Sequence, residues 1–263
     1  MNDTKEMTIL YDELIKVLPK IENELGLSEK LFSEVLLSSD DIQRNLIGDR
    51  IKDLFYGCLF REVYVISFSD QVDSLPMWSM YGKNGNGLCL VFDKDKVNSY
   101  MDDYHQVKEV YYCLDKGPAN SYIKEKYREC YNEKEITDFL TEVLFDLSGR
   151  VKNSAYSAEQ EYRIIEHVVY ENDLKKRNIY LDLNNSQTTE RPNFISEAKV
   201  RAQNGLLIPY KEIKLPIECL SSVIVGPSIN QKLQREGLRI LLKGTHLTDD
   251  DIILSDIPYR VTR

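Results

Sequence analysis

The order of apolar and polar residues divides the chain into an early helical part and a later part rich in strands. Between residues 9 and 18, apolar side chains recur every three or four positions, which predicts an amphipathic helix that Pro19 should break or kink. Two further helices are predicted between residues 28 and 55, each opened by serine residues that can cap a helix. Residues 1–60 should therefore form a helical N-terminal part.

From residue 61 onward, short runs of β-branched and aromatic residues separated by turn residues predict strands. The expected strands cover residues 63–69, 88–92, 107–113, 162–170, 179–183, 205–213, 219–225 and a short segment near Ile252. Helices are expected over residues 120–150, split near Asn132, and over residues 231–243. This order predicts an α+β fold in a single domain, residues 1–263. Its N-terminal helical block (1–60) precedes an α+β core (61–263) with a mixed, mostly antiparallel sheet and flanking helices.

Composition narrows the classes of protein to which the chain can belong. Of its 263 residues, 42% are hydrophobic and 29% are charged, which suits a globular fold and excludes collagen-like, disordered and membrane-spanning classes. Lys and Arg number 34 against 43 Asp and Glu, and the net charge of −9 argues against an extended nucleic-acid or anionic-membrane surface. Five cysteines without a C-x-x-C pair, and no signal-peptide pattern, predict a reducing, cytoplasmic setting.

Common catalytic and metal-binding motifs are missing from the sequence. The three histidines, His105, His167 and His246, are isolated, so no metal site is predicted. Neither a phosphate-binding loop nor a nucleophile elbow occurs. The glycines at positions 82, 85 and 87 depart in spacing from the dinucleotide-binding fingerprint, and we interpret them as a tight turn between two strands.

The first candidate for chemistry is a serine pair followed by an aromatic segment. Ser67 and Ser69 stand at alternate positions of a predicted strand, so their hydroxyls point to the same face. Trp78, the only tryptophan, follows after a polar loop, with Tyr81 close behind it. A hydroxyl pair beside an aromatic ring can hold a ribose and stack a flat ring. The alternative, favoured on these residues alone, is that the serines satisfy local backbone groups and Trp78 anchors the core.

The second candidate is the charged segment of residues 159–163. In strand geometry, Glu159, Glu161 and Arg163 project to one face. Two neighbouring carboxylates repel each other, so the pKa of one should rise unless Arg163 compensates. Such a cluster can stabilise a developing cation or act as a general base. A surface ladder of ion pairs, each of them weak, explains the same residues equally well.

Taken together and in this order, these motifs resemble an uncharacterised microbial family, domain of unknown function 2971 (DUF2971). The resemblance rests on Ser67-Phe-Ser69, Met77-Trp78-Ser-x-Tyr81, Gly87-x-Cys89-x-x-Phe92, Glu159-x-Glu161-Tyr162-Arg163 and later segments at 207–210, 222–227 and 255–260. Members of that family usually carry a tryptophan before Glu-x-Glu, near where this chain has Tyr156, and open with a Tyr-His-Tyr-Thr-like strand that this sequence lacks. The resemblance therefore implies a shortened member or a start codon placed late.

The same layout is also similar to that of ADP-ribosyltransferases. This similarity implies that NAD is the substrate, that Glu161 stabilises an oxocarbenium-like transition state and that Glu159 orients the acceptor. The nucleotide-binding residues would then be Ser67, Ser69, Trp78, Tyr81 and Arg163. Such a protein would bind a small-molecule nucleotide and would act as a toxin or anti-phage effector in a bacterial cell.

Two other interpretations stay open at this stage. A non-catalytic binding or regulatory module would dock an unidentified protein partner through the early helices, its activity lost with the missing first strand. A metal-dependent nuclease would draw on Asp70, Asp73, Glu159 and Glu161, but the acidic balance and the lack of a basic groove disfavour it.

Overall fold

The computed structural model describes five stretches of the chain. They cover residues 4–26, 62–129, 133–168, 194–203 and 205–258. The helices expected between residues 28 and 55 and the strand expected at 179–183 lie outside the described residues. Within these stretches, no helix is both long enough and apolar enough to cross a membrane.

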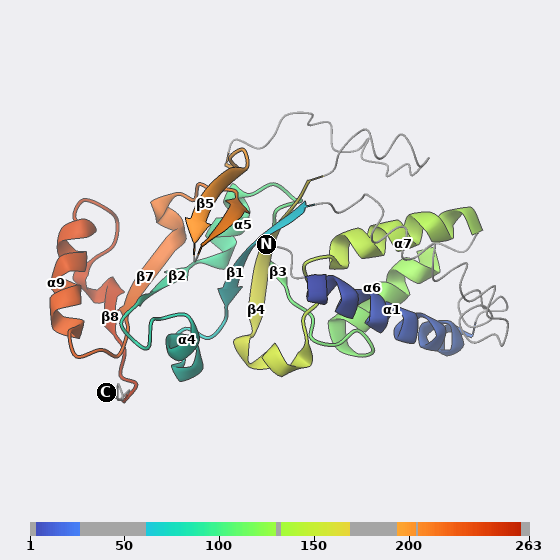
Figure 1. Cartoon of the computed structure of the whole chain (residues 1–263), viewed down its shortest axis with the longest axis horizontal. Helices are drawn as coiled ribbons and strands as arrows, with labels where there is room; N and C mark the ends of the chain where they lie inside the picture. Colours follow the sequence, from blue (N-terminus) through green and yellow to red (C-terminus); the bar gives the residue numbers. More distant parts are fainter. Residues whose placement is uncertain (1–3, 27–61, 130–132, 169–193, 204, 259–263) are drawn as a thin grey trace.

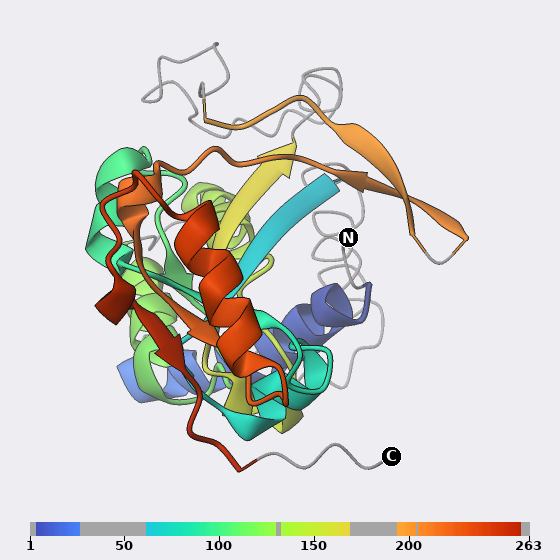
Figure 2. The same cartoon turned by 90° about the vertical axis from the view of Figure 1, so that its left-hand side faces the viewer.

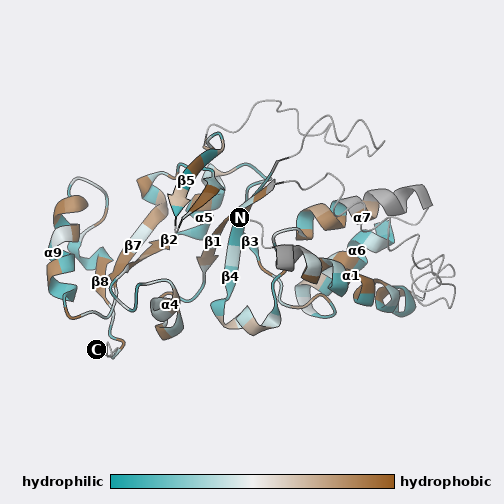
Figure 3. Cartoon of the chain, viewed as in Figure 1, coloured by the Kyte–Doolittle hydropathy of each residue, from teal (hydrophilic) through white to brown (hydrophobic). Residues whose placement is uncertain are grey.

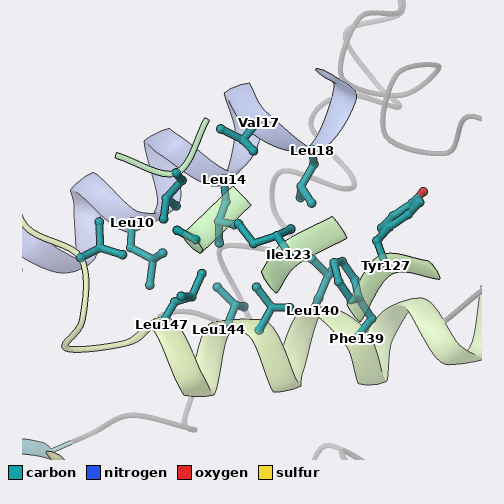
Figure 4. Packing of buried hydrophobic residues seen from close by; sticks show 14 of the residues in the cluster. Leu10, Leu14, Val17, Leu18, Ile123, Tyr127, Phe139, Leu140, Leu144 and Leu147 are labelled. Atoms are coloured by element: carbon teal, nitrogen blue, oxygen red, sulfur yellow. The ribbon is translucent and has the colours of Figure 1, made fainter. Parts of the chain in front are cut away.

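Three helices at one end of the molecule enclose its largest hydrophobic core (Figure 1). They are α1 (Thr4–Leu25), α6 (Gly117–Glu129) and α7 (Glu133–Leu147). Figure 4 shows Leu10 and Leu14 of α1 pointing toward Leu144 and Leu147 of α7, with Ile123 of α6 between them. Leu10 and Leu14 are four positions apart and Leu144 and Leu147 are three apart, so each pair lies on one side of its helix, the side that is removed from water.

Helix α1 continues through Pro19 and ends at Leu25, so the expected break at this proline is wrong. A proline inside a helix removes one backbone hydrogen bond and costs about 3 kcal/mol. The neighbours Leu18 and Ile21 are fully buried in the helical core. Burial of two large aliphatic side chains offsets a cost of this size, because each contributes about 2 kcal/mol.

A three-stranded antiparallel sheet packs against this core and has the order β1-β4-β3. Its strands are β1 (Glu62–Ser69), β4 (Glu161–Val168) and β3 (Lys108–Glu109). Val63 of β1 and Ile165 of β4 belong to the helical core, so one face of the sheet is turned toward the helices. The register places Ser67 opposite Arg163 and Ser69 opposite Glu161, which brings all four to that same face.

A second sheet lies beyond β1 and has the order β2-β7-β8. Its strands are β2 (Leu88–Phe92), β7 (Leu220–Val225) and β8 (Ile252–Leu254). Strand β2 runs antiparallel to β7, and β8 runs parallel to β7. Helix α9 (Gln231–Leu241) packs on this sheet through Leu238. The expected α+β fold with mixed, mostly antiparallel strands is therefore confirmed.

The remaining elements are short. They are a hairpin of β5 (Lys199–Gln203) and β6 (Leu206–Tyr210), the helices α4 (Leu75–Met80) and α5 (Lys94–Tyr100), and the 3-10 helices η1 (Ser154–Glu159), η3 (Ile217–Cys219) and η4 (Asp249–Asp251). The strand expected over residues 107–113 is shorter than predicted. The backbone N–H of Val110 still donates to the carbonyl oxygen of Glu161 over 3.0 Å, and beyond it Tyr111 forms an isolated parallel bridge with Val151.

Candidate functional site

Glu159 and Glu161 are both buried, but they come from different kinds of element. Glu159 is the last residue of η1 and Glu161 is the first residue of β4. Between them, Gln160 adopts a left-handed conformation with φ of 43° and ψ of 58°. The expectation that Glu159, Glu161 and Arg163 share one strand face therefore holds only for Glu161 and Arg163. A left-handed residue redirects the chain, and this turn places the Glu159 carboxylate beside that of Glu161.

Lys152 joins the two carboxylates. Its Nζ atom lies 2.6 Å from Oε2 of Glu159 and 2.9 Å from Oε2 of Glu161. On the other side of Glu161, Arg163 donates from Nε to Oε1 over 2.8 Å and from a terminal nitrogen to Oε2 over 3.1 Å. Arg163 also donates to the carbonyl oxygen of Gly149 at 2.6 Å. Two buried anions are thus matched by two cations, the arrangement that buried charges require.

These contacts fix the charge states of the cluster. Burial alone would raise the pKa of Glu161, but hydrogen bonds from Arg163 and Ser67 hold it below its usual value of 4.5. Burial would lower the pKa of Lys152, yet its hydrogen bonds to Glu159 and Glu161 raise it well above its ordinary range. Glu161 is therefore anionic and Lys152 cationic at neutral pH. The cluster is a buried network, and the alternative of a surface ion-pair ladder is wrong.

The two serines of β1 belong to the same cluster. The Ser67 hydroxyl is hydrogen-bonded to the carboxylate of Glu161. The Ser69 hydroxyl donates to the backbone carbonyl of Glu159 over 2.6 Å and accepts from the backbone N–H of Gln71 over 3.0 Å. Ser67 therefore supports a side chain, whereas Ser69 holds the end of η1 against β1.

Trp78 and Tyr81 lie in different surroundings. The Trp78 side chain is buried, and its indole N–H donates to Asp73 over 2.6 Å. Asp73 also accepts from the Ser255 hydroxyl at 2.8 Å, and a Cβ atom on Gly82 would come within 2.5 Å of the Trp78 ring. Trp78 is thus a core anchor, as the interpretation favoured from sequence had it. Tyr81 is exposed, and its hydroxyl donates to Oε1 of Glu159 over 3.0 Å.

A cavity of about 340 Å³ opens beside Glu161. It is lined by Asp70, Glu109, Val110, Tyr112, Ser157, Gln160, Glu161 and Tyr162. All three charged side chains in this lining are carboxylates, and two of the remaining residues are tyrosines. The Tyr112 hydroxyl also accepts from the backbone N–H of Glu161 over 2.9 Å. The cavity therefore suits a small ligand that carries positive charge.

Sequence reasoning missed Lys152 and Tyr112. No spacing rule connects Lys152 with Glu161, because a turn and the 3-10 helix η1 separate them. Tyr112 lies in a predicted strand next to Tyr111. A tyrosine combines an apolar ring with a hydroxyl that finds a hydrogen-bond partner when buried, and this was the signal in the sequence that could have indicated a site residue. Of the carboxylates considered for a metal-dependent nuclease, Glu159 and Glu161 share Lys152 and Asp70 lines the cavity beside Glu161, whereas Asp73 accepts hydrogen bonds from Trp78 and Ser255. Within the stretches that the structure describes, no group of three or more His, Cys, Asp or Glu could hold a metal ion.

Comparison with known proteins finds one family model that matches a part of the chain. Residues 77–164 match the model of the family described as "Protein of unknown function (DUF2971)". No curated protein and no solved structure matches the chain. The matched segment contains Trp78, Tyr81, Lys152, Glu159 and Glu161. Over residues 77–164, the chain is therefore similar to the DUF2971 family.

Proposed function

We propose that the acidic cavity beside Glu161 binds the cationic ring of NAD⁺ and that the protein cleaves its N-glycosidic bond, as ADP-ribosyltransferases do. The observation that carries this proposal is the cavity itself, whose lining includes three acidic residues, Asp70, Glu109 and Glu161. The nicotinamide ring of NAD⁺ is flat and positively charged. Carboxylates and tyrosine rings both attract such a group, the first by charge and the second through their π faces.

The surroundings of Tyr162 support the same ligand. Lys94 holds its ammonium group 4.4 Å from the centre of the Tyr162 ring, so this ring already engages a cation. Lys94 is exposed at the start of α5, on a flexible stem. A bound nicotinamide would take over the ring, and Lys94 would then be free to meet the phosphates of the nucleotide.

The chemistry requires an anion that is fixed in place. When the bond between the ribose C1′ atom and the nicotinamide nitrogen breaks, its electron pair leaves with the nicotinamide and positive charge develops on the ribose. Glu161 would stabilise that charge, and Arg163 and Ser67 would keep its carboxylate oriented and ionised. Water, or an acceptor hydroxyl oriented by Glu159, adds to C1′ and releases one proton to solvent. The products of hydrolysis are nicotinamide and ADP-ribose.

Release of nicotinamide from NAD⁺ tests this proposal directly. The wild-type protein should release it, and Glu161→Gln should reduce the rate by about 100-fold or more, the loss typical of removing one transition-state contact. Glu212→Gln is the matched control, because Glu212 forms an exposed ion pair with Lys199 and neither residue lines the cavity. Circular dichroism should show that both variants are folded. Absence of nicotinamide release by the wild type would contradict catalysis.

A second candidate is a nucleotide-binding module without catalysis. One observation favours it: both oxygens of Glu161 already accept hydrogen bonds from Lys152 and Arg163, which reduces the negative charge available to a substrate. Such a protein would bind NAD⁺ with the same cavity and leave it intact. Titration calorimetry with NAD⁺, read beside the release assay, separates binding from turnover.

The cellular role follows from the chemistry if turnover is found. An enzyme that consumes NAD⁺ in the cytoplasm would act as a toxin or anti-phage effector in a bacterial host. Induction of the wild-type gene should then deplete cellular NAD⁺ and arrest growth, and induction of Glu161→Gln should do neither.

A further inference from the structure

A second cavity lies on the face of β1 and β4 that is turned away from the helical core. Its volume is about 70 Å³, and its lining includes the ion pair of Glu166 and Lys211 and the isoleucines Ile66, Ile164, Ile195 and Ile213. Side chains alternate along β4, so Glu166 lies on the face opposite to Glu161. This cavity is therefore separate from the proposed NAD⁺ site, and it shares no lining residue with it.

The wall across from the sheet comes from the two segments that lead into the β5–β6 hairpin. Figure 2 shows these segments (orange) crossing the ends of β1 (cyan) and β4 (yellow), where they supply Ile195, Lys211 and Ile213. Ile195 and Ile213 form an antiparallel bridge, and backbone hydrogen bonds of 2.8 and 2.9 Å flank it. Figure 3 shows hydrophobic residues (brown) along β1, which supplies Ile66. Hydrogen-bonded backbone on both sides gives the cavity a fixed shape.

Lys211 brings a charged group into this apolar space. Its side chain is only 5% exposed, and its ammonium group donates to Oε1 of Glu166 over 2.5 Å. The ammonium nitrogen also lies 5.2 Å from the centre of the Tyr64 ring. An ammonium group has three N–H donors, and the residues that the structure describes accept a hydrogen bond from one of them. Buried donors without an acceptor are costly, so the other two call for a partner inside the cavity.

Water alone fills such a cavity poorly. A water molecule needs roughly 10–15 Å³ measured in this way, so the cavity has room for about five. A buried water typically makes about three hydrogen bonds, and the isoleucine side chains offer none. Waters would thus be satisfied at the end that holds Lys211 and not along the rest of the wall. An occupant with an aliphatic body and a polar tip satisfies both ends.

Glu166 decides the kind of polar tip. Its Oε1 atom accepts from Lys211, and its Oε2 atom lies 2.8 Å from Nε2 of His105. A second anion at Lys211 would be repelled by this carboxylate, which already serves as the counter-ion of the lysine. A carboxylate has about four acceptor sites, so Glu166 can accept a further N–H as well. Spare donors beside a spare acceptor match a carboxamide, whose oxygen accepts and whose N–H donates.

We propose that this cavity binds a small neutral aliphatic carboxamide. The carbonyl oxygen of the ligand accepts from Lys211, its amide N–H donates to Glu166, and its branched aliphatic body lies among the four isoleucines. The site needs no turnover of NAD⁺, so it stands or falls independently of the function proposed for the Glu161 cavity.

Isobutyramide and isobutyrate are matched probes, because they share one shape and differ in charge. Both are titrated at pH 7 into the full chain with labelled isoleucine methyl groups, and the methyl spectra are recorded. Isobutyramide should shift the signals of Ile195 and Ile213 and leave Ile253 of β8, which does not line the cavity, unchanged. Isobutyrate should bind at least about tenfold more weakly, because like charges then meet at Glu166. Equal binding of the two would overturn the proposal, and so would no shift with either, which would mean a cavity that holds only water.

Two substitutions locate the site. Ile66→Phe should fill the cavity and abolish the shifts, and the fold should tolerate it because Ile66 is 37% exposed. Ile253→Phe is the matched control, since Ile253 is also a strand isoleucine and is 44% exposed. Lys211→Met keeps the aliphatic stem without the donors and should weaken isobutyramide binding by about tenfold. Circular dichroism reports folding, and if Lys211→Met does not fold, Ile66→Phe still decides. Unchanged binding by folded Ile66→Phe would overturn the proposal.

Discussion

Lys152 and Glu161 form a buried ion pair in which Nζ of the lysine lies 2.9 Å from Oε2 of the glutamate. Replacing Lys152 with methionine would leave two carboxylates with only Arg163 to balance them. We expect Lys152→Met to lower the free energy of unfolding by roughly 3 kcal/mol at pH 7, the lower end of the cost of breaking a buried pair. Urea unfolding measures this loss.

The pH dependence of that loss identifies its origin. Without Lys152 the pKa of Glu161 should rise, so protonation of the carboxylates relieves the repulsion, and the difference from wild type should shrink below pH 4.5. Lys16→Met is the control, because Lys16 pairs with Glu13 on the exposed side of α1 and should contribute little. An equal loss at pH 7 and pH 4 would mean that packing, and not charge, is responsible.

The Tyr112 hydroxyl is the acceptor for the backbone N–H of Glu161. Tyr112→Phe leaves that N–H without its partner and should cost about 1 to 2 kcal/mol. Tyr81→Phe removes a hydrogen bond from an exposed hydroxyl, which water can replace, so its cost should be much smaller. Thermal unfolding of both variants compares them, and equal losses would contradict the importance of this contact.

His167 makes the fold sensitive to acid. Burial lowers the pKa of His167 to about 4, with Lys108 adding to the effect. The ring is hydrogen-bonded to Ser148 over 2.8 Å and to Tyr104 over 3.1 Å. The pKa of His167 in the unfolded chain is 6.5. The contribution of neutral His167 to the stability of the fold is therefore complete above pH 6.5 and is lost as pH falls toward 4. The loss should reach about 3 kcal/mol, and His167→Gln should remove this part of the acid dependence in a urea titration at successive pH values.

His105 makes the stability of the fold depend on pH in the opposite direction. Burial alone would lower the pKa of His105, but hydrogen bonds to Glu166 and Asp102 raise it above 6.5. Its ring nitrogens lie 2.7 Å from Asp102 and 2.8 Å from Glu166, which also pairs with Lys211 at 2.5 Å. The stabilisation by protonated His105 is therefore complete below pH 6.5 and is lost as pH rises through the pKa that His105 has in the folded state.

Direct titration of this histidine tests that sign. The ring proton signals of His105 should shift at a pH above 6.5. His105→Gln should flatten the fall in stability on the alkaline side. A His105 signal that titrates below 6.5 would show that burial outweighs the two carboxylates.

Most of the secondary structure was predictable because it depends on local properties. The β-branched and aromatic residues of β1 and β7 favour extended backbone wherever they are placed. The apolar residues of α1 recur at helical spacing, which predicts a helix with one side packed against a core. Pro19 was not predictable in this way. Whether a helix tolerates a proline depends on what its neighbours bury, and that is a property of the assembled core.

The candidate site was predictable only in part, for the same reason. The two-residue period of a strand was enough to place Glu161 and Arg163 on one face. The partnership with Lys152 depends on Gln160, and no rule based on residue type predicts a positive φ at a glutamine. Tyr112 likewise reaches Glu161 from a segment that only the tertiary fold brings near.

The left-handed residue Gln160 also constrains the number of residues at the junction between Glu159 and Glu161. One added residue at this junction would turn the start of β4 over, so that Glu161 and Arg163 would together leave the face that Lys152 and Ser67 occupy. A related sequence could thus keep every charged residue and still lose the cluster. Transplanting the cluster onto another scaffold would require copying the junction from Lys152 to Arg163 as one uninterrupted piece.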